Sequence, residues 1–355
     1  MPMERPATPP GPIGLVLPTF VQDTVPQWAE PPVRARPTDS DGTHPTSPTP
    51  LTGPGGPGAA GGGPIGELTD VCSRAEQLGA DALWACDHLF WHGPSLESML
   101  SLTVAATATT TATLGTCVVQ LPLRQAPAVA KQAATLQTLS KGRFVLGVGV
   151  GSHAGEYEQA GQDYRTRGRQ LDAGIRELRR SWATGRGVTA GDIGDGGGAR
   201  YRQLPEPEPI PVWVGGSSEA ALRRAATLAD GWMPLFVPPA EYREAIERLG
   251  KEIDRAGRPT EVVTPSIVLF VSIDDDPGRG LKKGTGWMSS LYGIPAKAFE
   301  RHIVSGSAAE VAAVVDTYRR AGARHVAVYV TEDQPLEQFE RLTVALAAVR
   351  APARG

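Results

Sequence analysis

Two hydrophobic patterns alternate along this chain, one with the period of a helix and one made of short apolar runs. Apolar residues from Leu68 to Leu78 recur at helical spacing and stop at Gly79, and the apolar run at 81–86 then has the length of a buried strand. The alternation predicts strands at 14–20, 81–86, 113–119, 143–148, 211–215, 231–236, 262–273 and 324–330, and helices at 65–78, 95–108, 127–140, 153–184, 218–229, 240–256, 307–321 and 336–350.

Eight strands that alternate with helices are the pattern of an α/β protein, a single (β/α)8 TIM barrel over residues 1–355. A doubly wound open sheet is the competing architecture, and the strand count favours the barrel. The chain has 355 residues, 41% of them hydrophobic, which is enough for one large core. In a barrel the active site lies at the carboxyl ends of the strands.

Three segments interrupt the regular pattern. Residues 21–64 are dense in Pro, Gly, Thr and Ser without periodic apolar positions, which predicts a long flexible insertion. Residues 186–210 and 274–305 are predicted to be irregular excursions from the barrel.

Composition narrows the class of partner to small molecules. The formal net charge is −3, which provides no general attraction to nucleic acid or to anionic membranes. The first residues, MPMERPATPPGP, lack the apolar core of a signal peptide, and no apolar run is long enough to span a membrane, so a cytoplasmic protein is expected. Cys72, Cys86 and Cys117 are odd in number and widely spaced, which indicates reduced thiols and argues against a disulfide framework or a zinc site.

The strand at 81–86 ends in the polar run Cys86-Asp87-His88, followed by Leu89-Phe90-Trp91-His92. A histidine at a barrel strand end can donate or take a proton near neutral pH, although a solvated loop histidine is the simpler reading. His88 and His92 have the spacing of a metal pair, but the H-E-x-x-H pattern is absent, so no metal is expected.

A glycine loop follows the strand at 143–148. Gly147, Gly149 and Gly151 alternate with valines and precede Ser152. This spacing resembles the dinucleotide fingerprint G-x-G-x-x-G. Ser152 stands where the third glycine is required, and the acidic Asp172 lies within a predicted helix, so the Rossmann interpretation is weak. A glycine-lined floor under a planar ring is the preferred interpretation.

The strand at 211–215 leads into Gly215-Gly216-Ser217-Ser218 and then into a helix. Backbone N–H groups, serine hydroxyls and the helix dipole converge at such a point, which predicts a phosphate seat. An ordinary serine N-cap after a tight turn is the alternative.

These motifs resemble the luciferase-like monooxygenase superfamily of flavin- and deazaflavin-dependent (β/α)8 barrels. The resemblance covers 12–20 and 65–350 and is carried by ADALWACDHLFW, LGTCVVQLPLRQAPAVAKQAATLQTLSKGRFVLGVGVG, EYEQAGQDYRTRGRQLD and PIPVWVGGSSEAALRRAATLADGWMP. The motifs are most similar to those of the branch that uses a deazaflavin, coenzyme F420. FMN is the alternative cofactor. The resemblance also implies a homodimer.

The resemblance assigns roles to individual residues. It implies that His88 is the active-site histidine with Asp87 beside it, and that a bulge, often with a non-prolyl cis peptide, supports the cofactor ring at Cys117-Val118. The ring edge and side chain would pass Gly149, Val150 and Gly151, and the phosphate would reach Gly215, Gly216, Ser217 and Ser218.

The chain departs from family patterns in three places. Val150 stands where bacterial luciferases carry an arginine for the flavin phosphate, and Ser152 stands where sugar-phosphate dehydrogenases carry a glutamate acid. Luciferase-type phosphate recognition is therefore doubtful and sugar-phosphate oxidation is not expected. The connection 21–64 is longer than in relatives.

These features predict an oxidoreductase that uses a reduced deazaflavin or flavin. With this cofactor the enzyme would transfer a hydride to a small organic substrate or oxygenate it. His88 would be the general acid or base, and Asp87 would orient it or hold its charge. If His88 does not carry the proton, the alternatives are Asp87, Glu156 or a bound water. The alternatives are an FMN-dependent monooxygenase, a flavin-binding protein without turnover, and a metal hydrolase that uses Asp87, His88 and His92. The sequence does not identify the substrate. An apolar pocket for it could be lined by Phe90, Trp91, Trp287 and Tyr292.

Overall fold

Parallel strands close on themselves in the computed structural model, which describes residues 13–18, 63–91, 95–184, 205, 207–332 and 334–350. Each barrel strand pairs with the next, and the last strand pairs with both its predecessor and the first, which closes the ring. The predicted TIM barrel is confirmed, and the open sheet is excluded. The eight barrel strands are β1 (Ile13–Val16), β2 (Ala82–Ala85), β3 (Thr113–Thr116), β5 (Phe144–Gly149), β6 (Val212–Gly215), β7 (Gly231–Met233), β8 (Thr264–Ile273) and β10 (His325–Val330).

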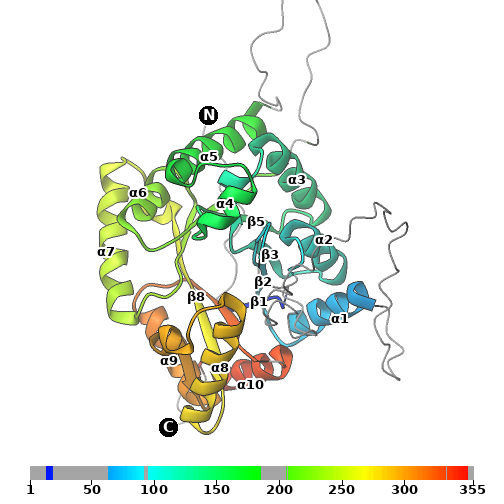
Figure 1. Ribbon diagram of the computed structural model, residues 1–355, viewed down its shortest axis with the longest axis vertical. Helices are drawn as coiled ribbons and strands as arrows, with labels where there is room; N and C mark the ends of the chain where they lie inside the picture. Colours follow the sequence, from blue (N-terminus) through cyan, green and yellow to red (C-terminus); the bar gives the residue numbers. More distant parts are fainter. Residues whose placement is uncertain are drawn as a thin grey trace, which may run out of the picture.

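Helices surround the strands as an outer ring (Figure 1). Their apolar faces pack on the strands and form one large buried cluster between the two layers. The helices are α1 (Gly63–Gln77), α2 (Ser98–Ala108), α3 (Ala126–Leu139), α4 (Ala154–Gln159), α5 (Arg167–Thr184), α6 (Glu219–Leu228), α7 (Pro239–Arg255), α8 (Pro277–Tyr292), α9 (Ala308–Arg320) and α10 (Pro335–Arg350). None of the described helices is long and apolar enough to span a membrane.

A second cluster fills the inside of the barrel. Trp84 and Trp213 lie with ring centroids 5.2 Å apart, and the Trp84 indole N–H donates to Nε2 of the buried His325 over 2.9 Å. Glycines make room for these large rings, because a Cβ at Gly115 would lie 2.2 Å from Trp84 and one at Gly231 would lie 2.4 Å from Trp213. The interior is therefore packed solid around these rings, as in other barrels of this type.

Residues 274–305, predicted to be irregular, form the 16-residue helix α8, a 3₁₀ turn (Ala296–His302) and the strand β9 (Ile303–Gly306). Glycines at 278, 280, 284 and 286 lower the helix propensity of this segment, which led to the wrong prediction. Tertiary packing overrides that propensity. Gly284 sits where a Cβ would come within 2.8 Å of Ile303, and Asp276 and Gly293 cap the two ends.

Other boundaries differ locally from the prediction. The strand expected at 113–119 is split into β3 and the short β4 (Val119–Gln120), which pairs with β5. The helical stretch at 153–184 is divided into α4, a 3₁₀ turn and α5. Nearly all of 21–64 and most of 186–210 lie outside the described residues.

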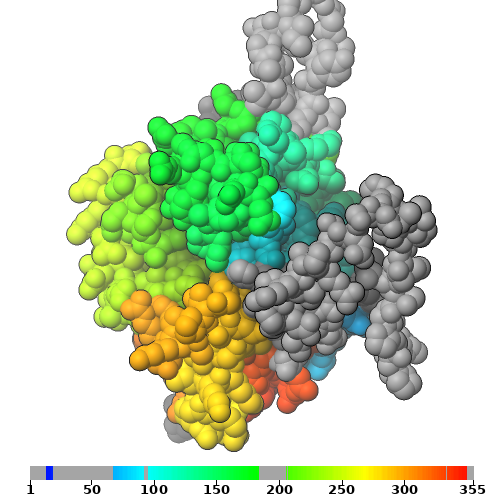
Figure 2. Space-filling model, viewed as in Figure 1, coloured from blue at the N-terminus to red at the C-terminus, as the bar shows by residue number. Residues whose placement is uncertain are grey.

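The carboxyl ends of the strands and the loops that follow them lie on the face seen in Figure 2, which has the orientation of Figure 1. There the cyan segment after β2 lies between the green segment that holds α4 and the yellow to orange segment that holds α8. These three segments build the site.

Candidate active site

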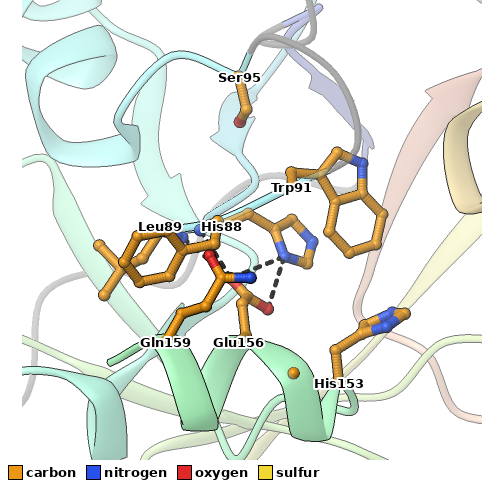
Figure 3. A pocket seen from close by; sticks show the side chains of 9 residues that line it. His88, Leu89, Trp91, Ser95, His153, Glu156 and Gln159 are labelled. Atoms are coloured by element: carbon orange, nitrogen blue, oxygen red, sulfur yellow. Dashed lines mark hydrogen bonds and ion pairs between the residues drawn. The ribbon is translucent and has the colours of Figure 1, made fainter. Parts of the chain in front are cut away.

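His88 lies on the loop that follows β2, where its ring faces the carboxylate of Glu156 on α4 (Figure 3). Nδ1 of His88 is 3.1 Å and 3.3 Å from the two carboxylate oxygens. The backbone N–H groups of Leu89 and Phe90 donate to Glu156 Oε1 over 2.9 Å and 3.3 Å. Glu156, which is 3% exposed, therefore holds both the imidazole and the loop that carries it.

Gln120, from β4, completes this network. Its side-chain N–H₂ group lies 3.0 Å and 3.1 Å from the Glu156 oxygens, and 3.1 Å from the backbone oxygen of Asp87. Burial alone would raise the pKa of Glu156, but hydrogen bonds from His88 and Gln120, the charge of His88 and the Phe90 N–H outweigh it and lower that pKa. Glu156 is thus a buried carboxylate held in its ionised form.

The carboxylate of Asp87 is directed toward Arg124. The fully buried carboxylate of Asp87 accepts hydrogen bonds from Ser98 Oγ at 3.2 Å and from the backbone N–H of Gln120 at 3.0 Å. Arg124 Nη2 pairs with the same carboxylate at 2.5 Å. Arg124 also pairs with Glu97 at 3.1 Å. Asp87 therefore ties together the loops after β2 and β4, and the carboxylate beside His88 is that of Glu156.

Aromatic rings surround His88. Its imidazole stacks on Trp91 with ring centroids 3.8 Å apart, and Trp91 meets His153 and Tyr292 edge to face at 4.8 Å and 5.3 Å. Tyr292 is the last residue of α8, so this helix contributes one wall of the region. The ring cluster places apolar surface directly beside the candidate proton carrier.

A cavity of about 480 Å³ opens at this point (Figure 3). It is lined by His88, Leu89, Phe90, Trp91, Ser95, His153, Gly155, Glu156 and Gln159. Of the aromatic residues suggested for the substrate pocket, Phe90 and Trp91 line it and Tyr292 lies behind Trp91. Trp287 instead lines a separate cavity of about 440 Å³ with Lys283, Thr331, Glu332 and Gln334.

The residues expected to support the cofactor ring come together at the ends of three strands. The peptide bond between Cys117 and Val118 is cis, as the family resemblance implied. The Val118 side chain fills the space beside two glycines, because a Cβ at Gly149 would lie 2.4 Å from it and one at Gly215 would lie 3.0 Å from it. The bulge after β3 therefore touches the ends of both β5 and β6.

The alternating glycines are explained by packing within the protein. Gly149 accommodates Val118, and Gly151, which has a φ of +66°, lies where a Cβ would be 1.8 Å from Oε1 of Gln120. The space on this side of the loop is thus filled by the chain's own side chains, and the passage of a ring along Gly149, Val150 and Gly151 stays a prediction. The Val150 carbonyl accepts a hydrogen bond from the Tyr157 hydroxyl over 2.5 Å.

The predicted phosphate seat lies next to this bulge, at the amino terminus of α6. Gly216 has a φ of +98°, and Gly216, Ser217 and Ser218 are all exposed. The Ser218 hydroxyl accepts from the Ala221 N–H over 3.2 Å, so this residue is the N-cap of the helix. Ser217 and the remaining N–H groups of the first turn face solvent and can meet an anion.

The metal hydrolase interpretation gains no support from the geometry. His92 lies outside the described residues, and within them no group of three or more His, Cys, Asp or Glu side chains is arranged to hold a metal ion.

Gln120 and His153 are site residues that the sequence did not indicate, and Glu156 was named only as an alternative proton carrier to His88. Glu156 lies within the quoted EYEQAG motif, but an acidic residue early in a helix normally indicates favourable interaction with the helix dipole. Its contact with His88 joins residues 68 positions apart, and only the barrel brings them together.

Comparison with known proteins agrees with this architecture. The family model described as luciferase-like monooxygenase matches residues 47–282. The chain is 29% identical over 315 residues to an F420-dependent glucose-6-phosphate dehydrogenase of Kineococcus radiotolerans, an alignment that covers 79% of this chain and 93% of that protein. The chain therefore belongs to the luciferase-like monooxygenase family and is an oxidoreductase of that family.

Solved structures share the fold. An F420-dependent secondary alcohol dehydrogenase in complex with an F420-acetone adduct superposes with a TM-score of 0.69 at 18% identity, over 81% of this chain and 96% of that one. The oxygenating constituent of 3,6-diketocamphane monooxygenase from Pseudomonas putida, in complex with FMN, superposes with a TM-score of 0.63 at 15% identity, over 80% and 93% of the two chains. At these identities the similarity establishes the barrel alone.

Proposed function

We propose that this protein is an oxidoreductase that binds the deazaflavin coenzyme F420 and catalyses hydride transfer from it to a small organic substrate. His88 acts as the general acid or base. The observation that carries the proposal is the contact of the His88 imidazole with the buried, ionised Glu156 at the wall of a cavity at the carboxyl ends of the barrel strands. The relative from Kineococcus radiotolerans, named as F420-dependent, supports the choice of cofactor over FMN.

The chemistry of the residues at the end of β6 fits a phosphorylated cofactor. Gly216 lacks a side chain and adopts a positive φ, Ser217 offers an exposed hydroxyl, and the first turn of α6 presents backbone N–H groups. Gly215 is in contact with Val118, so an anion bound here would lie on the same side of the molecule as the bulge after β3. When bound, the cofactor would supply the hydride.

The protein's own contribution is to move a proton and to exclude water. Glu156 accepts a hydrogen bond from Nδ1 of His88, which fixes the ring, and Nε2 is then the atom through which His88 would exchange a proton with the substrate. Trp91 stacked on the imidazole and Tyr292 behind it cover one side of the site with apolar surface. Asp87 supports the loop through Arg124 and takes no part in the proton transfer.

We place the substrate outside the sugar phosphates. The resemblance puts a glutamate acid of those enzymes at the position of Ser152, which here offers a hydroxyl, and whose backbone oxygen accepts from Tyr164 over 3.1 Å. Activity of the purified protein with glucose 6-phosphate and coenzyme F420 would contradict this part of the proposal.

Titration of the purified protein with coenzyme F420 and with FMN, followed by absorbance and fluorescence, tests the cofactor assignment. We expect saturable F420 binding with weaker FMN binding. A protein that prefers FMN would instead be a flavin-dependent monooxygenase, and one that binds neither would refute the proposal.

A matched pair of variants tests the phosphate seat. Ser217→Asp places a negative charge where the phosphate is expected, and should weaken cofactor binding at least tenfold, or by about 1.4 kcal/mol. Ser217→Asn has a similar shape without the charge and should bind with nearly unchanged affinity. Equal affinities for the two variants would mean that Gly215 to Ser218 serve only as a helix cap.

A further inference from the structure

Two thiols from neighbouring strands meet at the mouth of the barrel. Cys86 directly follows β2 and Cys117 directly follows β3, and these strands pair in register. The Cys117 N–H donates to the carbonyl of Ala85 over 2.8 Å, and the Sγ atoms of the two cysteines are 3.8 Å apart, in hydrogen-bond contact. Both residues are partly exposed, whereas Cys72 is fully buried in α1.

The thiol pair lies beside two tyrosines, Tyr292 of α8 and Tyr329 of β10. The hydrogen bond with Cys86, burial and the charge of Cys86 when ionised raise the pKa of Cys117 well above its usual value. The Tyr329 hydroxyl is buried and has no hydrogen-bond partner among the described residues. Cys117 is therefore a neutral thiol at neutral pH, and its sulfur lies in hydrogen-bond contact with that of Cys86.

We propose that Cys86 and Cys117 form a reversible disulfide when the protein meets a peroxide, and that this bond weakens cofactor binding. In the first step Cys86, which is partly exposed, is oxidised by hydrogen peroxide to a sulfenic acid, and one water is released. In the second step the Cys117 sulfur attacks the Cys86 sulfur, the S–O bond breaks, and the Cys117 proton leaves with the hydroxide as a second water. Two thiols and one peroxide thus yield one disulfide and two waters.

The geometry connects this bond to the cofactor. A disulfide is about 2.05 Å long, so the sulfurs must approach each other by roughly 1.8 Å. Cys117 precedes Val118, whose side chain packs against Gly149 and Gly215 with no room to spare. Moving Cys117 therefore displaces the bulge that touches the ends of β5 and β6. This consequence rests on the proposed function, and we expect the oxidised protein to bind coenzyme F420 at least tenfold more weakly.

The test uses the full-length protein, treated with hydrogen peroxide, blocked with N-ethylmaleimide, and examined by intact mass and peptide mapping. We expect a mass loss of two hydrogen atoms, two fewer blocked thiols, and a cross-linked peptide that contains Cys86 and Cys117. The Cys86→Ser and Cys117→Ser variants should not form it. Cys72→Ala is the matched control, since burial raises the pKa of Cys72 to about 12 and its removal should leave the cross-link intact.

Two results would overturn the proposal. Free thiols, or sulfinic acids in place of the cross-link, would show that the pair does not close. A disulfide whose formation leaves F420 affinity unchanged, before and after reduction with dithiothreitol, would show that it does not act on the cofactor. If the reduced protein binds neither F420 nor FMN, the proposed function fails, while the mass measurement still decides whether the disulfide forms.

Discussion

Replacing Glu156 by Gln removes one negative charge from the centre of the site and changes little else in shape. The carboxylate accepts from the Nδ1 of His88, from the N–H groups of Leu89 and Phe90, and from the Gln120 amide. A glutamine retains one acceptor oxygen and turns its N–H₂ group toward donors that need an acceptor. Each lost hydrogen bond to a charged group costs about 1.5–3 kcal/mol, so loss of one or two of them should lower the free energy of unfolding by roughly 1.5–6 kcal/mol.

The pH dependence of this difference has a definite sign. The pKa of Glu156 is lowered in the folded protein from its ordinary value of 4.5, so its charge contributes stability above that value, and this contribution is lost as the pH falls through the folded pKa. The difference between wild type and Glu156→Gln should therefore be complete at pH 7 and should shrink at acidic pH.

Urea unfolding followed by tryptophan fluorescence measures both quantities. Glu158→Gln is the matched control, because it makes the same charge change on an exposed position of α4 two residues away. We expect this control to change stability by less than about 0.5 kcal/mol. If Glu156→Gln is as stable at pH 7 as Glu158→Gln, then Glu156 is not the charged anchor of the His88 loop, and the positioning argument is refuted.

The other predictions concern chemistry and core packing. His88→Ala should leave F420 affinity nearly unchanged and lower turnover by about two to four orders of magnitude, measured as the oxidation of reduced F420 once a substrate is found. Near-normal turnover would instead direct attention to His153, which lines the same cavity. Gly231→Ala should lower the free energy of unfolding by about 1–3 kcal/mol, because the new Cβ would lie 2.4 Å from the Trp213 ring. Gly250→Ala on α7, where a Cβ would meet nothing within 4 Å, should instead stabilise the protein by up to about 1 kcal/mol, and equal effects of the two changes in a thermal melt would contradict the packing argument.

The barrel itself could be predicted from local pattern. A buried parallel strand requires a short continuous apolar run and its covering helix requires a repeat of 3.6, and both are visible within a window of ten residues. The position of His88 after a strand then placed it at the correct end of the barrel, because all strands of a parallel barrel point the same way. The error at 274–305 arose from the same locality, since the close packing of Ile303, Thr331 and Ser272 against Gly284 of α8 is not visible in a local pattern.

The composition of the site was decided by tertiary structure. A sequence reading pairs His88 with its neighbour Asp87, but successive residues leave the backbone in different directions, and Asp87 turns to Arg124 while His88 turns to Glu156. The three cysteines are widely spaced in the sequence, yet the register of β2 with β3 sets Cys86 and Cys117, 31 residues apart, within 3.8 Å. Hydrophobic periodicity determines which elements form and which way they face. The distances between side chains on different elements depend on barrel register and loop path, because these are set by the packing of the whole ring and by no short stretch of the chain.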